Sequence, residues 1–100
     1  MLFMVVETFK NHDLKAIYQR LRERGRSMPE GLNFVNSWVD ASGGRCFQLM
    51  ESDNVLLFQQ WIAEWHDLVS FDVIPVVQGK ETAEAIAALL DRASHTTQKN

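Results

Sequence analysis

Two polar side chains fall inside segments that otherwise have the pattern of buried strands. Glu7 interrupts the apolar run LFMVVETF, and Gln48 stands inside the segment CFQLM. A buried carboxyl or amide group without a hydrogen-bond partner costs roughly 1–3 kcal/mol, so each needs a partner or a function. Burial raises the pKa of a carboxyl group toward the range of a general base, which makes Glu7 a candidate catalytic residue. The alternative is that Glu7 pairs with a basic residue, either Arg45 or one of the run 20–26.

Other polar residues near the same segments are candidates for binding a ligand. Asn36 precedes Trp38 by two positions, so their side chains share one face of a strand. Arg45 begins another strand segment, and its guanidinium group suits an anion or an oxyanion. His12 follows the first apolar segment, where it would lie at the mouth of a cavity as a second candidate base; capping or surface exposure is its alternative. Alternation alone does not decide whether these side chains and Glu7 face one cavity.

The segment WIAEWHDLVSFDVIPVV begins with two tryptophans four residues apart. At about 100° per residue, Trp61 and Trp65 lie in the middle of an apolar helical stripe that also contains Leu57 and Phe58. His66 falls about 140° away on the polar side, so we expect it at the surface and not as a haem ligand. The two indole rings either pack as core against a sheet or form the wall of a ligand cavity. In either role, each buried indole N–H needs an acceptor.

Hydrophobic periodicity predicts the elements that position these residues. The predicted strands cover residues 2–9, 32–41, 45–52 and 69–78, and the predicted helices cover residues 14–24, 54–67 and 80–93. Asn11 or Asp13 is expected to cap the first helix and Gly25 to end it, while Ser52 or Asp53 is expected to cap the second. A single domain therefore covers residues 1–93, and the polar segment 94–100 is expected to be a flexible tail.

The predicted order, β-α-β-β-α-β followed by a helix, is the ferredoxin-like arrangement of an α+β fold. Right-handed crossovers place the first and third strands in the centre of the sheet and the second and fourth at its edges. Pro75 supports this order, because proline has no N–H to donate to a neighbouring strand and belongs in an edge strand.

Both faces of the first predicted strand are apolar. Leu2, Met4 and Val6 point one way, and Phe3 and Val5 point the other. A four-stranded sheet with helices on one side is expected to have one wet face, so something must cover the second face. We expect a second copy of the chain to cover it, sheet against sheet, in a twofold homodimer. The alternative is that the C-terminal helix folds over part of that face.

Composition excludes several classes of protein. The chain has 100 residues and a formal net charge of −3, and although six of its ten basic residues lie between positions 10 and 26, no aromatic residues interleave them as base stacking requires. We therefore expect no nucleic-acid partner. Cys46 is the only cysteine, which suits a cytoplasmic protein. We expect no signal peptide, no membrane span and no metal site, because the sequence contains none of the corresponding patterns.

Four segments carry a resemblance to a known family: MLFMVVETFK, RLRERGRSMPEGL, CFQLMESDN and WIAEWHDLVSFDVIPVV. Together they resemble the bacterial family catalogued as domain of unknown function 3303, from Met1 to about Ala88. The resemblance implies a dimeric α/β barrel with a ferredoxin-like subunit, and it implies no reaction. The wider fold group includes cofactor-free oxygenases, haem-degrading enzymes, lactone isomerases and ligand-binding regulatory domains. In several of these the ligand lies between the sheet and the helices, but a shared fold does not by itself assign a function.

These observations favour a homodimeric protein that binds a small aromatic or anionic metabolite between its sheet and its helices, without a cofactor. The expected ligand-binding residues are Asn36, Trp38, Arg45, Gln48, Trp61 and Trp65. The first alternative is a cofactor-free oxygenase or isomerase that uses Glu7 or His12 as a base. The second is a non-catalytic interaction module that meets an acidic partner through its basic run. Whether the protein is an enzyme stays open, because no nucleophile motif, metal set or phosphate loop is present.

Overall fold

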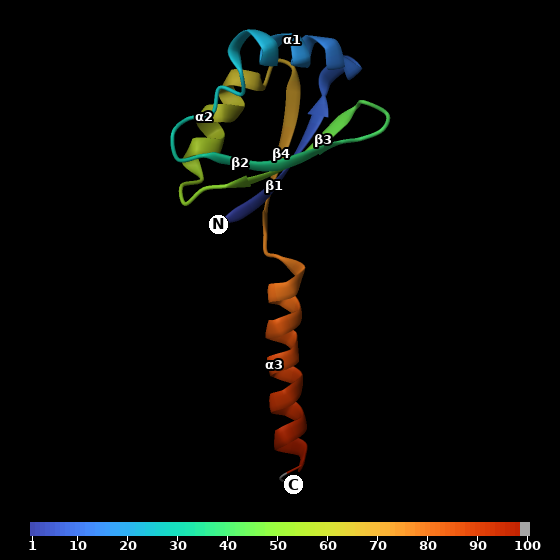
Figure 1. Cartoon of the computed structure of the whole chain (residues 1–100), viewed down its shortest axis with the longest axis vertical. Coiled ribbons are helices and arrows are strands. Elements are labelled where there is room, and N and C mark those ends of the chain that lie inside the picture. Colours follow the sequence, from blue (N-terminus) through green and yellow to red (C-terminus); the bar gives the residue numbers. More distant parts are fainter. Residues whose placement is uncertain (99–100) are drawn as a thin grey trace.

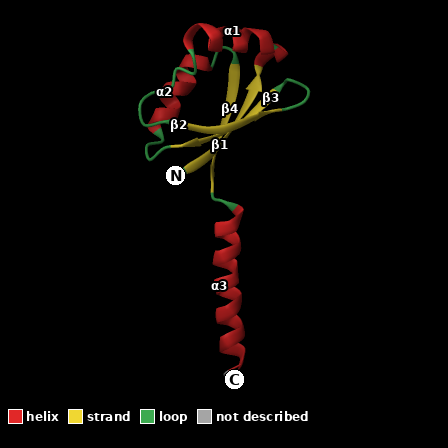
Figure 2. Cartoon of the chain, in the orientation of Figure 1, coloured by secondary structure: helices red, strands yellow, loops and turns green. Residues whose placement is uncertain are grey.

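The chain folds as an α+β unit in which two helices lie on one face of a four-stranded antiparallel sheet (Figure 1). The computed structural model describes the backbone of residues 1–98 and the side chains of residues 1–93. The elements are β1 (Leu2–Phe9), the 3-10 turn η1 (Lys10–His12), α1 (Leu14–Arg24), β2 (Asn33–Val39), β3 (Arg45–Glu51), α2 (Leu56–Trp65), β4 (Val69–Val76) and α3 (Gly79–Gln98). The predicted ferredoxin-like order followed by a C-terminal helix is confirmed (Figure 2).

The strands are arranged in the order β2-β3-β1-β4, so the predicted central and edge strands are confirmed. Pro75 lies in β4 opposite Phe3 of β1, on the strand that needs to donate hydrogen bonds to one side only. The pairing of β2 with β3 shifts between Phe34 and Asn36, which marks a bulge in the other edge strand. Bulges of this kind twist an edge strand and change the direction of its side chains.

The helix ends follow local hydrogen bonds. The Asp13 side chain accepts a hydrogen bond from the backbone N–H of Ala16 at 3.1 Å, and α1 ends at Gly25 with a positive φ of 68°, both as predicted. The expected cap of α2 is wrong. Ser52 Oγ accepts from the Asn54 N–H at 3.1 Å and so builds a turn, and Asn54 Oδ1 accepts from the Leu56 N–H at 3.0 Å. This extra turn delays the start of α2 to Leu56.

The core lies between α1, α2 and the sheet face that these helices cover, which we call the inner face. Edge-to-face aromatic pairs connect the layers: the ring centroids of Phe3 and Phe58 are 4.7 Å apart, and those of Trp61 and Phe71 are 5.1 Å apart. The buried apolar residues are Phe3, Val5, Phe9, Ile17, Leu32, Cys46, Met50, Phe58, Trp61, Trp65 and Val69.

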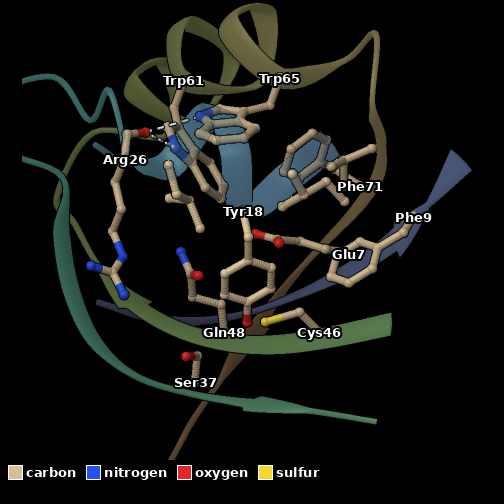
Figure 3. Close-up of a pocket in the computed structure, with 13 residues that line it drawn as sticks. Glu7, Phe9, Tyr18, Arg26, Ser37, Cys46, Gln48, Trp61, Trp65 and Phe71 are labelled. Atoms are coloured by element: carbon tan, nitrogen blue, oxygen red, sulfur yellow. Dashed lines mark hydrogen bonds between the residues drawn. The ribbon is translucent and has the colours of Figure 1, made fainter. Parts of the chain in front are cut away.

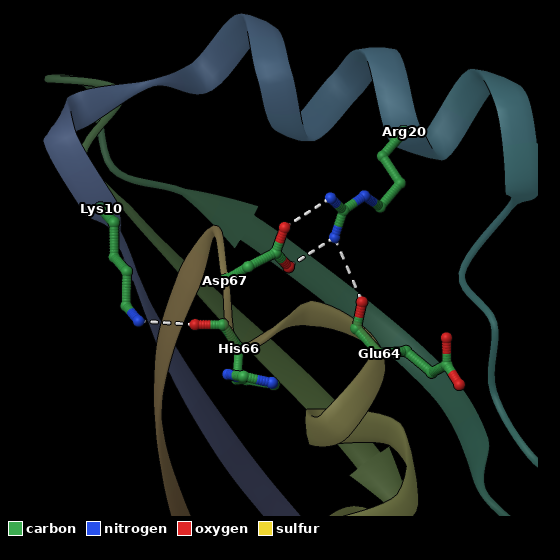
Figure 4. Close-up of polar contacts among 5 residues, drawn as sticks. All are labelled: Lys10, Arg20, Glu64, His66 and Asp67. Carbon is green, nitrogen blue, oxygen red and sulfur yellow. Dashed lines mark hydrogen bonds and ion pairs between the residues drawn. The ribbon is translucent and has the colours of Figure 1, made fainter.

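A polar clamp joins α1 to the turn between α2 and β4 (Figure 4). Arg20 donates two hydrogen bonds of 2.6 Å to the carboxylate of Asp67 and a third, of 3.2 Å, to the carbonyl oxygen of Glu64. Lys10 donates to the carbonyl oxygen of His66 in the same turn. The Arg20 guanidinium group lowers the pKa of Asp67 to about 2, so the clamp stays charged at any ordinary pH. It holds α1 above the inner face of the sheet.

No element of the described chain covers the opposite face of the sheet, which we call the outer face. Its edge strands leave large apolar side chains open to solvent: Trp38 is 51% exposed and Ile74 is 45% exposed. The central strands add half-buried apolar side chains between them. The apolar residues of the outer face are Leu2, Met4, Val6, Trp38, Phe47, Leu49, Ile74 and Val76.

Helix α3 projects away from the rest of the domain (Figure 1). Every residue from Val77 to Ala93 is exposed, so α3 buries no side chain of its own chain there. The alternative in which the C-terminal helix folds over the outer face is therefore wrong, because the chain after β4 continues past the end of the sheet without turning back. The helix extends to Gln98, beyond the predicted end at Ala93. Of the tail predicted at 94–100, residues 99–100 lie outside the described residues.

Candidate functional site

A cavity of about 100 Å³ lies between the inner face of the sheet and helices α1 and α2 (Figure 3). A single water needs roughly 10–15 Å³ measured in the same way, so the space is larger than one or two waters require. Most of the wall is aromatic or aliphatic, and the polar groups come from β1, β2, β3 and the segment after α1. The cavity is lined by Glu7, Phe9, Ile17, Tyr18, Leu21, Arg26, Ser37, Cys46, Gln48, Trp61, Trp65, Val69 and Phe71.

The two tryptophans of α2 form one wall of this cavity. Trp61 is 3% exposed and Trp65 is 4% exposed, which confirms that both lie on the buried stripe of the helix. Their indole N–H groups donate to the same acceptor, the backbone carbonyl oxygen of Arg26, at 3.0 and 2.9 Å (Figure 3). Neither indole N–H is therefore left to bind a ligand, and the rings act as rigid apolar walls.

Glu7 lies in the central strand β1 and its carboxyl group faces the cavity (Figure 3). Only 9% of the residue is exposed, and loss of solvation raises its pKa from 4.5 to about 7, against a smaller opposing effect of the nearby positive charge of Arg26. Among the described residues no cation lies within ion-pair distance of Glu7. Of the two partners considered for Glu7, Arg45 lies on the outer face and pairs with Asp40 at 3.1 Å. The basic run 20–26 comes near Glu7 through Arg26, whose charge acts on the carboxyl group without an ion pair.

Two side chains of β3 complete the floor of the cavity. Gln48 is 6% exposed, its amide points into the cavity (Figure 3), and its Nε2 donates to Met50 Sδ at 3.3 Å. Cys46 is buried as predicted, and burial together with the Glu7 carboxylate raises the pKa of its thiol to about 11. The thiol therefore stays protonated near neutral pH and is a poor nucleophile. In this position Cys46 is a small apolar wall residue.

Arg26 is a site residue that the sequence analysis named only as part of the basic run 20–26. Of the described residues that line the cavity, it is the one cation. Its guanidinium carbon lies 3.8 Å from the centroid of the Phe34 ring, a cation–π contact that holds the charge at the rim. Gly25 ends α1 directly before it, so the chain turns and brings Arg26 over the cavity. The sequence signal was its place at the end of the basic run, immediately after the helix stop.

The structure separates the other predicted site residues from the cavity. Asn36 and Trp38 lie opposite Leu49 and Phe47 on the outer face, so they do not share a cavity with Glu7. Asn36 Oδ1 accepts a hydrogen bond from the Ser37 N–H at 2.8 Å.

Arg45 and His12 also lie away from the cavity. Arg45 is on the outer face, where its guanidinium group stacks over Phe47 at 5.3 Å. His12 is exposed, and its ring lies against Gly44 in the turn between β2 and β3. Of the predicted ligand-binding residues, the structure brings together Gln48, Trp61 and Trp65, with Glu7 beside them.

Two further findings bear on the chemistry open to the described residues. They contain no group of three or more histidine, cysteine or acidic side chains that could hold a metal ion. None of the described helices combines the length and the apolar character that crossing a membrane requires.

Comparison with known proteins assigns the chain to a family. The profile of the family described as Domain of unknown function (DUF3303) matches residues 1–90, and the chain belongs to this family. The comparisons with curated proteins and with solved structures gave no match. The family description names no activity, so a function must be argued from the cavity.

The raised pKa of Glu7 predicts a specific dependence of stability on pH. The folded chain holds a proton on Glu7 up to about pH 7, whereas the unfolded chain releases it near pH 4.5, so the unfolding free energy falls as pH rises through this window. At 1.36 kcal/mol per pKa unit, the loss above pH 7 is about 3 kcal/mol.

Urea denaturation between pH 4.5 and 8 measures this effect in Glu7→Gln. From pH 4.5 to 8, the unfolding free energy of the variant should rise by about 3 kcal/mol relative to that of wild type, because the amide does not ionise. Glu51→Gln, which changes an exposed carboxylate, is the control and should follow the wild-type curve. If the unfolding free energies of wild type and Glu7→Gln change in parallel with pH, the pKa of Glu7 is not raised by folding.

Proposed function

We propose that the protein is a cytoplasmic homodimer in which each subunit binds one small molecule between its sheet and its helices. The observation that carries the proposal is the cavity itself, with mostly apolar walls and a few polar side chains, among them Glu7, Arg26 and Gln48. A mostly apolar cavity with a few converging polar groups is the usual composition of a ligand site. Its volume also counts against an interaction module with a solid core.

The lining favours a flat ligand with an acidic group. Trp61, Trp65 and Tyr18 offer ring faces, and Arg26 offers a positive charge at the rim. Below about pH 7 the carboxyl group of Glu7 is protonated and can donate a hydrogen bond to a ligand, as the guanidinium group of Arg26 can. A ligand carboxylate or phenolate would accept from both, while its ring stacks on the indole walls. The cavity volume suits a molecule of about one ring.

Binding of benzoate tests this chemistry. Trp61 and Trp65 line the cavity, so benzoate is expected to change their fluorescence. Arg26→Gln should weaken binding by about 10-fold or more, because a charge-assisted hydrogen bond contributes roughly 1.5–3 kcal/mol. Arg24→Gln removes an exposed arginine that does not line the cavity and should change binding less than twofold. Equal affinities for the two variants would contradict the role of Arg26.

The homodimer is proposed from the outer face of the sheet. Its apolar side chains run across all four strands, and water contacts Trp38 and Ile74 at its edges. A second copy placed sheet against sheet would bury the same surface on both subunits around a twofold axis. The two inner-face cavities would then lie on opposite sides of the paired sheets.

Ile74→Glu tests the sheet-to-sheet dimer. Each dimer contains two copies of the substitution, and each copy removes one isoleucine side chain from the interface. The loss of each side chain weakens the dimer by about tenfold, so the dimer dissociation constant should rise by about 100-fold. Val55→Glu makes the same kind of change at an exposed apolar residue directly before α2 and should leave the dimer intact. Sedimentation equilibrium measures both constants. A wild-type protein that sediments as a monomer at micromolar concentration would rule out this dimer.

A second candidate function is a cofactor-free oxygenase or isomerase, and one observation favours it. Glu7 has a pKa of about 7 inside an apolar cavity, so near neutral pH a substantial fraction of the enzyme carries a desolvated carboxylate. Such a carboxylate can remove a proton from a carbon acid or a phenol, the step from which either reaction would begin. Arg26 would stabilise the negative charge that develops on the ligand.

Exchange of the methyl protons of pyruvate with D₂O, followed by NMR, tests Glu7 as a base. The exchange rate should rise with pH up to about 7 and then level, because only ionised Glu7 accepts a proton. Glu7→Gln should lower the rate at least about 100-fold, the usual contribution of general-base catalysis. Glu51→Gln is the matched control. If pyruvate exchanges no faster with the wild-type protein than in buffer alone, Glu7 is not a base for this reaction, and ligand binding is the function that we propose.

A further inference from the structure

The overall dimensions of the chain exceed those of a compact domain of the same length. Its radius of gyration is 18.9 Å, whereas a compact domain of 100 residues has about 13 Å. Its accessible surface is 7106 Å², whereas a compact monomer of 11.5 kDa exposes about 5,800 Å². The excess of about 1,300 Å² is larger than the roughly 800 Å² that each partner buries in a standard protein–protein interface. Helix α3 is the element that projects (Figure 1).

One side of α3 is apolar and the other is polar. At about 100° per residue, Ile86, Leu89 and Leu90 fall on one side, and Glu84 and Asp91 fall on the opposite side. The three apolar side chains are 49%, 54% and 65% exposed. A stripe of this kind is the pattern of a helix that packs against another surface.

An unsupported helix of this length has little stability of its own. Helices in proteins owe most of their stability to the packing of an apolar face, and isolated ones of about 12–15 residues are marginal in water. From Gly79 to Ala93 every side chain of α3 is exposed, so its own chain supplies no such packing there. The apolar side chains Ile86, Leu89 and Leu90 therefore have a surface to gain from a partner.

We propose that α3 is an arm that packs its stripe of Ile86, Leu89 and Leu90 against a second copy of the chain. The inference rests on the proposed homodimer and adds a second contact to it. The outer face and the arm are neighbours along the chain: Ile74 and Val76 belong to the outer face at the end of β4, and α3 begins at Gly79, three residues after β4 ends. A subunit docked on the outer face would thus lie beside the start of α3.

Twofold symmetry makes the exchange reciprocal. Each subunit would give one arm and receive one, so both copies of every stripe residue would be buried in the dimer. The excess surface of the isolated chain is then buried without any change in the sheet domain. An arm of 20 residues spans about 30 Å, which is long enough to reach across a neighbouring subunit of this size.

The first test compares Leu90→Glu with Ala88→Glu. Both place a carboxylate on α3, but Leu90 is on the apolar stripe and Ala88 is on the polar side. We expect Leu90→Glu to raise the dimer dissociation constant by about 100-fold, because each dimer loses two buried leucines, and Ala88→Glu to leave it within threefold. Circular dichroism and tryptophan fluorescence should show an intact sheet domain in both. Equal dissociation constants for the two variants would overturn the arm.

Ile74→Glu separates the arm from the sheet-to-sheet contact. If Ile74→Glu dissociates the dimer and Leu90→Glu does not, the homodimer stands and the arm is wrong. If wild-type protein is a monomer, the homodimer and the arm both fail. If each substitution weakens the dimer, both contacts belong to it.

Hydrogen exchange of the wild-type chain provides a test without any substitution. The amides of α3 should be protected at concentrations well above the dimer dissociation constant and should lose protection on dilution to the monomer. The amides of β1 and β3, in the centre of the sheet, should keep their protection in both conditions. Rapid exchange throughout α3 in the undiluted dimer would overturn the proposal.

Discussion

Two indole N–H groups that share one backbone carbonyl oxygen hold this structure together around its cavity. Trp61 and Trp65 are the bulkiest residues of the core, and neither can be buried without an acceptor for its N–H. The carbonyl oxygen of Arg26 accepts from both, so the segment after α1 is drawn down onto α2. The same bonds fix where the Arg26 side chain begins. These two hydrogen bonds thus close the core, orient both indole rings and place the positive charge of Arg26 at the rim.

The cavity floor is polar at a cost to stability. Glu7 stands in the centre of the sheet, where an aliphatic residue would pack without any loss of solvation, and its pKa of about 7 measures that loss. A strained or poorly solvated group inside an otherwise well-packed core is typical of sites that are kept for function. Near neutral pH Glu7 is divided between its two forms, so the cavity can offer either a hydrogen-bond donor or a base. The two proposed functions, ligand binding and proton transfer, would therefore use the same side chains.

The two faces of the sheet differ in what covers them. The inner face is covered by α1 and α2 and holds the cavity, and the Arg20–Asp67 clamp keeps α1 in place above it. The outer face and α3 contribute nothing to that cavity, and both present apolar side chains to solvent. In the proposed dimer these two surfaces are contacts between copies. Substitutions on them should change assembly while the residues of the cavity stay in position.

Local patterns in the sequence were enough to predict the order of the elements, the central and edge strands and the buried stripe of α2. These features depend on near neighbours: the spacing of apolar residues, the Asp13 cap, the Gly25 stop and the missing N–H of Pro75. They also predicted that Glu7 and Gln48 would need an explanation, since polar groups inside strands are unusual wherever the strands lie.

Only the tertiary structure decided which residues share the site. Alternation says which side chains share a face of a strand but not which face the helices cover, and the bulge in β2 changes the count again. Asn36, Trp38 and Arg45 therefore lie on the outer face, while Glu7 and Gln48 lie on the inner one. Arg26 joins the site through hydrogen bonds made by its backbone to α2, 35 and 39 residues away, which no local pattern encodes. The direction of α3 is likewise set by the path of the chain after β4, because an amphipathic stripe shows that a helix needs a partner without showing where the partner lies.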